Sequence, residues 1–177
     1  MSSEKQTRIL LFTGDGKGKT TAAAGMALRA AGHGMRSLII QFVKNDEKTG
    51  EIAACAKIPE IEIMQTGMGF VPDRESPLFM DHKKGAERGL EIAARALSSG
   101  DYGVVVLDEI CVAVSKELLD EQDVLRVIKD AKSGCVIVLT GRNAAQGLLE
   151  AADTVTEMKC LKHGYKRGVK AQMGVEF

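Results

Sequence analysis

Several features that mark common kinds of protein are scarce or missing in this sequence of 177 residues. Lysine plus arginine equals aspartate plus glutamate at 24 each, so no overall field attracts nucleic acid or an anionic membrane. The amino-terminal stretch Met1 to Arg8 is polar, and no apolar run approaches the roughly 20 residues that span a bilayer. We therefore expect a cytoplasmic protein with no nucleic-acid or membrane partner, whose affinity for any anion is local.

The four cysteines are far apart and suggest no metal or redox chemistry. Cys55, Cys111, Cys135 and Cys160 form no Cys-x-x-Cys pair, and no histidine lies at zinc-finger spacing from them. Cys111 and Cys135 lie in or beside apolar runs, so we expect them to be buried thiols, whereas Cys160 is the more exposed candidate.

Familiar catalytic units are missing as well. The sequence has no serine-nucleophile motif, no paired histidine and aspartate, and no His-Glu-x-x-His segment. Its chemistry must therefore need little help from a protein acid or base.

Short apolar runs alternate with helical segments throughout the chain, which predicts an α/β fold with a mostly parallel central sheet of about six strands between helices. The length suits a single domain over residues 1–177. Most of the strand candidates are rich in valine, isoleucine and leucine without alternation, which indicates burial on both faces. They are Arg8 to Thr13, Ser37 to Val43, Glu60 to Gln65, Gly103 to Leu107, Cys135 to Thr140 and Thr154 to Met158.

Helical patterns lie between these strands, and two segments do not fit either pattern. The predicted helices are Gly18 to Ala31, the apolar series Ala86 to Leu97 and Val124 to Ala131, and Asn143 to Ala151 with Asn143 as its cap. Lys44 to Glu51 and Thr66 to Pro77 are expected to be loops. Each follows the carboxyl end of a strand, which is the edge where open α/β sheets bind ligands.

The segment Thr13-Gly14-Asp15-Gly16-Lys17-Gly18-Lys19-Thr20-Thr21 follows an apolar strand and opens a helix. Its glycines let backbone N–H groups surround anionic oxygens, Lys19 adds a charge, and the Thr20 hydroxyl can bind magnesium. We interpret it as a P-loop whose residues Gly14 to Thr21 bind the phosphates of ATP, in a three-layer fold like that of P-loop NTPases.

Two other interpretations of this segment are weaker. A glycine-rich turn alone does not need Lys-Thr at the start of a helix, and the dinucleotide fingerprint fails because Lys19 stands where its third glycine should be. One position is irregular, since the usual pattern Gly-x-x-x-x-Gly-Lys-Ser/Thr requires glycine at Thr13.

A second pattern suits the same nucleotide. Val104-Val105-Val106-Leu107-Asp108-Glu109 is an apolar strand that ends in two acids, as in a Walker B motif. Asp108 would hold magnesium directly or through water, and Glu109 would polarise a water or join the metal ligands, so the candidate metal ligands are Thr20, Asp108 and Glu109. Acids also end strands for solubility alone. Arg142 follows another strand, where it either neutralises phosphate oxygens or is merely solvated.

Together these segments resemble the P-loop family of ATP:corrinoid adenosyltransferases, and the resemblance runs nearly end to end. It is carried by Thr13 to Thr21, Gly32-His33-Gly34, Gln41-Phe42-Val43-Lys44, Thr66-Gly67, Val106-Leu107-Asp108-Glu109, Thr140-Gly141-Arg142, Ala152-Asp153-Thr154-Val155, Lys162-His163-Gly164 and Gly168-Val169-Lys170-Ala171-Gln172-Met173-Gly174. The last run is the most specific, because general P-loop chemistry does not require it.

The resemblance implies transfer of the 5′-deoxyadenosyl group from ATP to cobalt(I) of a reduced corrinoid, with release of triphosphate, in adenosylcobalamin biosynthesis or corrinoid salvage. Cobalt(I) is itself the nucleophile, which agrees with the missing base. The catalytic residues would be Lys19, Thr20, Glu109 and Arg142, with Mg²⁺ or Mn²⁺ accompanying ATP. A flavoprotein or other low-potential electron donor and a homodimer are implied as well.

Family members also carry bulky apolar side chains that displace the lower axial ligand of cobalt(II) corrinoids. Met68 and Phe70, in the loop after Thr66-Gly67, fall where such corrinoid-contacting side chains would lie, although this chain has only one aromatic there and no tryptophan anywhere. The alternative is that both residues anchor the loop to the core. For the whole protein, the competing functions are an ordinary P-loop kinase or ATPase and a non-catalytic corrinoid carrier.

Overall fold

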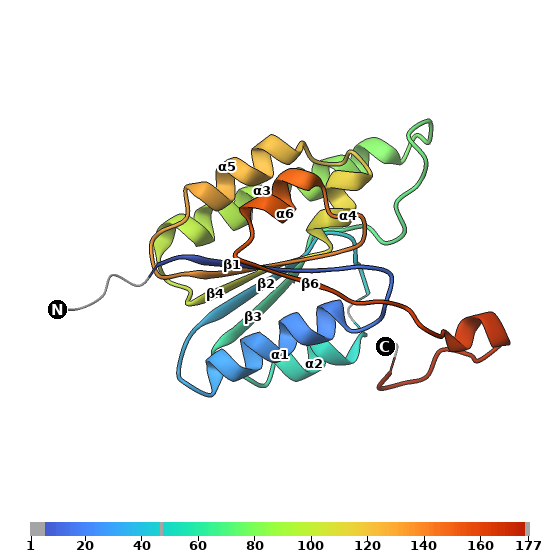
Figure 1. Ribbon diagram of the computed structural model, residues 1–177, viewed down its shortest axis with the longest axis horizontal. Coiled ribbons are helices and arrows are strands. Elements are labelled where there is room, and N and C mark those ends of the chain that lie inside the picture. Colours follow the sequence, from blue (N-terminus) through green and yellow to red (C-terminus); the bar gives the residue numbers. More distant parts are fainter. Residues whose placement is uncertain (1–5, 47, 176–177) are drawn as a thin grey trace.

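The computed structural model describes residues 6–46 and 48–175, which fold around one sheet of parallel strands (Figure 1). The strands are β1 (Arg8–Thr13), β2 (Ser37–Gln41), β3 (Ile61–Gln65), β4 (Val104–Asp108), β5 (Val136–Thr140) and β6 (Thr154–Glu157). The helices are α1 (Lys19–Ala31), α2 (Gly50–Cys55), α3 (Phe79–Ser99), α4 (Ile110–Ser115), α5 (Glu121–Lys129) and α6 (Gln146–Ala151), followed by a 3₁₀ turn, η1 (Gly164–Arg167).

The strand order is β3-β2-β4-β5-β1-β6, and each neighbouring pair is parallel. The predicted α/β class and six-stranded sheet are therefore confirmed. Because parallel strands end at the same edge, the P-loop after β1 and the acids after β4 share that edge, with the end of β5 between them.

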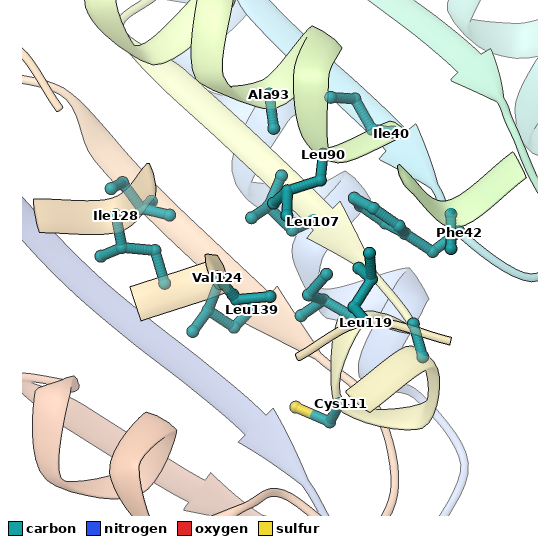
Figure 2. Close-up of a cluster of buried hydrophobic side chains, with 14 of the residues drawn as sticks. Ile40, Phe42, Leu90, Ala93, Leu107, Cys111, Leu119, Val124, Ile128 and Leu139 are labelled. Atoms are coloured by element: carbon teal, nitrogen blue, oxygen red, sulfur yellow. The ribbon is translucent and has the colours of Figure 1, made fainter. Parts of the chain in front are cut away.

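Helices cover both faces of the sheet (Figure 1): α1 and α2 lie on one face, and α3, α4, α5 and α6 lie on the other. Figure 2 shows the larger core, where Leu107 of β4 and Leu139 of β5 lie beneath Leu90 of α3 and Val124 of α5. A smaller cluster on the opposite face packs alanines of α1 against the sheet. This two-sided packing explains why β2, β4 and β5 are apolar without alternation.

Several local features differ from the sequence predictions. Helix α6 begins at Gln146 with Ala145 as its N-cap, so the expected cap at Asn143 is wrong. Asn143 instead adopts a left-handed turn conformation with φ of 54°. Helices α2 and α4 were not predicted, because six residues are too few to show helical periodicity. Strand β6 is exposed along its length because it pairs with β1 alone, at the end of the sheet.

In the part of the chain that the structure describes, no helix is both long enough and apolar enough to cross a lipid bilayer.

Candidate nucleotide-binding active site

The P-loop is pressed against the end of β6, and this contact explains where its glycines stand. The N–H of Gly16 donates to the carbonyl of Met158 at 2.6 Å. A Cβ atom added to Gly14 or Gly16 would lie 2.6 Å from the same carbonyl oxygen, and Gly14 also has φ of 94°. Thr13, by contrast, is the last residue of β1 and pairs with Glu157 of β6. The glycine therefore stands at position 14 and not at position 13, because position 14 is where the loop touches β6.

Lys19 is buried at the start of α1 and turns its ammonium group into the P-loop. Its Nζ donates to the carbonyl oxygens of Gly14 at 2.7 Å and Gly16 at 2.8 Å. Burial lowers the pKa of Lys19, although the nearby carboxylate of Glu109 opposes that shift. The predicted phosphate-binding charge therefore lies at the centre of the loop, where phosphate oxygens can replace the two carbonyls as its partners.

Asp108 is fully buried and joins the P-loop to the centre of the sheet. Its Oδ1 accepts hydrogen bonds from the hydroxyl of Thr20 at 2.8 Å and from the hydroxyl of Thr140 at 2.7 Å. The two hydroxyls come from α1 and β5, so residues 88 and 32 positions away in sequence meet on one carboxylate oxygen. Two of the candidate metal ligands, Thr20 and Asp108, thus lie in direct contact.

The second oxygen of Asp108 faces the opposite side of the site. Gln41 Nε2 donates to Oδ2 at 3.1 Å, and the ammonium of Lys44 lies 3.8 Å from it. Lys44 also forms an ion pair with Glu51 at 2.8 Å. A buried carboxylate needs such partners to be stable, and a charged neighbour matters most in a desolvated position.

Glu109 has a left-handed backbone with φ of 63°, at the N-cap of α4. Its N–H donates to the hydroxyl of Thr140 at 2.8 Å, which holds this sharp turn in place. Burial, followed by the adjacent charge of Asp108, raises the pKa of Glu109. The strained conformation brings both acids to the carboxyl edge of β4, as the sequence predicted.

Arg142 reaches across from β5 to the P-loop. Its Nε lies 4.0 Å from Oδ1 of Asp15, and both side chains are largely exposed. The other predicted phosphate-binding side chains, Lys17 and Thr21, are exposed as well. The structure therefore brings Arg142 beside the P-loop with its donors accessible to a ligand.

A cavity of about 490 Å³ opens beside the P-loop, between Gly16 and Lys17 on one side and residues 159–164 and 169–171 on the other. Lys162 and His163 line it, and so does Cys160. The carboxyl-terminal segment that carried the strongest part of the resemblance thus forms a wall of the phosphate-binding region.

Met68 and Phe70 lie in the loop after β3, which ends at the same edge of the sheet. The loop is fixed to the segment that follows β2, since the N–H of Gly69 donates to the carbonyl of Val43 at 2.7 Å. Phe70 is 93% exposed and Met68 46%, so Phe70 does not anchor the loop to the core. Its exposed ring leaves an apolar surface beside the site.

The donors suit a hard divalent cation. Thr20, Asp108 and Glu109 offer hydroxyl and carboxylate oxygens, which magnesium and manganese prefer. Over residues 6–46 and 48–175 there is no group of three or more histidine, cysteine, aspartate or glutamate side chains arranged to bind a metal. A cation here would take much of its coordination from phosphate and water, as magnesium does beside nucleotides.

No role was predicted from the sequence for Gln41, Lys44 or Thr140. They contact Asp108 only because β2 and β5 flank β4. Each is a polar residue at the end of an apolar strand, and that is the signal by which the sequence could have revealed them.

Comparisons with known proteins identify the family of this chain. Residues 5–177 match the family described as ATP:corrinoid adenosyltransferase BtuR/CobO/CobP. A corrinoid adenosyltransferase of Pseudomonas aeruginosa is 42% identical over 173 residues, which cover 96% of this chain and 83% of that protein. A corrinoid adenosyltransferase of Escherichia coli K12 is 34% identical over 171 residues, with 96% and 85% covered.

Among solved structures, a KaiC-like protein from Pyrococcus horikoshii is similar with a TM-score of 0.55 at 18% identity, over 88% of this chain and 72% of that one. This likeness confirms the fold expected of P-loop NTPases and carries no information about substrates. The match to the family and its relatives goes further: the chain belongs to the ATP:corrinoid adenosyltransferases and is an alkyl-transferring enzyme.

Proposed function

We propose that this enzyme transfers the 5′-deoxyadenosyl group of ATP to cobalt(I) of a reduced corrinoid and releases inorganic triphosphate. The observation that carries the proposal is the joint position of two features at one edge of the sheet. Lys19 and the Thr20–Asp108 pair would bind a phosphate chain and its metal, and the exposed Phe70 lies on a loop at the same edge.

The reaction is a displacement at the ribose C5′ atom. The cobalt(I) electron pair forms the cobalt–carbon bond while the bond from C5′ to the α-phosphate oxygen breaks, and that electron pair leaves with the triphosphate. No proton moves in this step, so no protein base is required. The protein must align the reactants and stabilise the charge that develops on the leaving group.

Lys19 is the main stabilising charge in this proposal. In the structure its ammonium donates to two loop carbonyls, and phosphate oxygens would replace them as its partners. Arg142 and the exposed Lys17 add charge at the rim of the loop. Backbone N–H groups of the loop and of the start of α1 complete the anion site.

Thr20, Asp108 and Glu109 would hold Mg²⁺, or Mn²⁺ in its place. Asp108 already accepts a hydrogen bond from Thr20, which leaves the lone pairs of the threonine oxygen to face the metal. The cation, when bound with ATP, supplies positive charge beside the departing triphosphate. The role of Glu109 is to orient the ligands of this metal and not to activate a hydrolytic water.

Met68 and Phe70 would contact the corrinoid and displace its lower axial ligand before reduction of cobalt(II). An exposed aromatic side chain is costly in water, so a large apolar substrate is a reasonable occupant of that surface. The one-electron donor would be a flavoprotein or another low-potential protein. We further propose that the enzyme acts as a homodimer in the cytoplasm.

Analysis of the products separates this function from its competitors. The protein is incubated with ATP, magnesium and a chemically reduced corrinoid, and phosphorus products are separated by ion exchange. We expect triphosphate and a light-sensitive adenosylated corrinoid in equal amounts. ADP or orthophosphate would instead identify a kinase or ATPase, and corrinoid binding without consumption of ATP would identify a carrier.

A further inference from the structure

Lys44, in the segment that follows β2, brings a positive charge to the two acids at the end of β4. Its ammonium lies 3.8 Å from Oδ2 of Asp108 and forms an ion pair with Glu51 at 2.8 Å. The same charge acts on Glu109, where it opposes the rise in pKa caused by burial and then by Asp108. The Lys44 side chain is 31% exposed, so a ligand that enters the site can reach the ammonium.

The backbone beside Lys44 is tied to the loop that carries Phe70. The N–H of Gly69 donates to the carbonyl of Val43, the residue before Lys44, at 2.7 Å. A Cβ atom added to Gly67 would collide with the backbone of Val43, so the two segments are in direct contact. Lys44 therefore has its backbone beside the loop that would hold the corrinoid and its ammonium beside the acids that would hold the metal.

The strand order places Lys44 between the two halves of the proposed site. The sheet runs β3-β2-β4-β5-β1-β6, and Phe70, Lys44 and Asp108 come after β3, β2 and β4 in that order. Lys19 and Arg142 come after β1 and β5, on the other side of β4. Along the carboxyl edge, Lys44 is thus a cation on the corrinoid side of the metal ligands.

The proposed reaction brings the two substrates together in this region. The corrinoid would rest on the loop after β3 and the triphosphate in the P-loop after β1, so the ribose C5′ atom and the α-phosphate come between them. When the bond from C5′ to oxygen breaks, its electron pair moves onto the α-phosphate oxygen. A positive group beside that oxygen stabilises the transition state more than the bound substrate.

We propose that Lys44 is a catalytic residue, whose ammonium donates a hydrogen bond to the α-phosphate oxygen that departs from C5′. The ammonium stays protonated, because the departing triphosphate keeps the electron pair and no proton is transferred. Lysine suits this role, since its compact charge on a flexible stem can turn from Glu51 to a phosphate oxygen. The inference rests on the proposed function, because it assigns a residue to the bond that the reaction breaks.

A purely structural role for Lys44 would be to position the buried carboxylate of Asp108. The two roles differ in their effect on a divalent cation bound by the acids. A cation that acts on the substrate also repels the metal, so its removal leaves metal binding as tight as before or tighter. Removal of a residue that positions Asp108 makes metal binding weaker. Metal affinity therefore separates the two roles without a measurement of turnover.

The first test is the rate of adenosyl transfer by Lys44→Met, which keeps the apolar stem and removes the charge. With ATP, magnesium and a chemically reduced cobalt(I) corrinoid, the single-turnover rate should fall about a hundredfold. The dissociation constant of ATP should change much less, because the contact strengthens as charge develops. Lys48→Met removes an exposed lysine of the same segment and is the matched control, with an unaltered rate. Lys44→Gln takes the place of Lys44→Met if the latter does not fold, with the same expected loss.

The second test is the affinity for Mn²⁺, measured by electron paramagnetic resonance with protein in excess over ATP and without corrinoid. Lys44→Met should bind Mn²⁺ at least as tightly as the unaltered protein. Weaker binding together with the loss of rate would show that Lys44 positions Asp108 and would overturn the proposal. An undiminished rate of transfer by Lys44→Met would overturn it as well.

Glu51→Gln separates the charge of Lys44 from its ion pair. This variant keeps the ammonium and loses its carboxylate partner, so we expect it to retain most of the transfer rate. A loss as large as that of Lys44→Met would mean that the ion pair braces the segment, and the catalytic assignment would be wrong. All of these outcomes presuppose transfer by the unaltered protein, and its failure to form an adenosylated corrinoid would instead refute the proposed function.

Discussion

At the scale of single residues, Lys19 shows how one charge is positioned by its surroundings. It is buried, it donates to two carbonyls of the P-loop, and burial lowers the pKa of its ammonium group. A desolvated charge interacts strongly with phosphate, so its removal should be felt mainly in the transition state.

We therefore expect Lys19→Ala to reduce adenosyl transfer about a thousandfold. The circular dichroism spectrum should stay unchanged, because the side chain packs against the loop and not in the apolar core. The control is Lys129→Ala, which removes an exposed lysine at the end of α5. Undiminished transfer by Lys19→Ala would refute the role assigned to this residue.

The order in which the cysteines react with an alkylating reagent is a second prediction at this scale. The thiolate form of cysteine is the nucleophile, whereas the protonated thiol is unreactive. Burial raises the pKa of Cys111 to about 12 and that of Cys135 to about 11. Both remain protonated as the pH rises from about 7 to about 9. Cys160 is exposed at the wall of the cavity beside the P-loop.

Alkylation of the folded protein should therefore modify the exposed Cys160 first, while Cys111 and Cys135 react only after unfolding. Mass spectrometry of peptides from the labelled protein checks the order. Early modification of Cys111 would mean that the region beneath α4 opens readily in solution.

At the scale of elements, the close contact between the end of β5 and α4 brings Arg142 to the P-loop. Gly141 has φ of 137°, and a Cβ atom there would lie 2.8 Å from Cβ of Cys111 and 3.0 Å from the backbone nitrogen of Val112. Gly25, within α1, has open space around it.

Gly141→Ala should lower the free energy of unfolding by about 2–4 kcal/mol, because both the backbone strain and the clash with α4 oppose it. Gly25→Ala should raise it by about 1 kcal/mol through helix propensity. Urea unfolding curves of the two variants measure both changes. If Gly141→Ala proved as stable as the unaltered protein, the approach of β5 to α4 would be looser than the structure indicates.

The elements also show what the sequence could and could not predict. Strands β2, β4 and β5 were clear because burial on both faces makes them continuously apolar, and the P-loop was clear because its residue types have a known chemistry. Helices α2 and α4 were missed because one or two turns leave no periodic pattern. The contact of Gln41 with Asp108 was missed for another reason: it depends on strand order, which local sequence does not determine.

The irregular P-loop shows the same limit. The sequence located the displaced glycine, but its physical cause is the carbonyl of Met158, more than a hundred residues away along the chain. Because β6 lies beside β1, a side chain at Gly14 or Gly16 would collide with the backbone of Met158.

At the scale of the whole molecule, the described helices pack on the two faces of one sheet, so both hydrophobic cores share its strands. The proposed nucleotide site uses residues of α1, β4 and β5, so it depends on the centre of that sheet. A chain organised in this way should unfold as one unit, in keeping with the single domain predicted from its length.

We expect coincident urea transitions when unfolding is followed by tyrosine fluorescence and by far-ultraviolet circular dichroism. ATP with magnesium, at a hundred times its dissociation constant, should stabilise the folded protein by about 2.7 kcal/mol and shift both transitions together. The same ligand should have no effect on Lys19→Ala if that residue provides most of the phosphate affinity. A ligand bound at the centre of the sheet stabilises every part of the chain that unfolds together with the sheet. Separate transitions for the two probes would therefore show that part of the chain unfolds independently of the sheet.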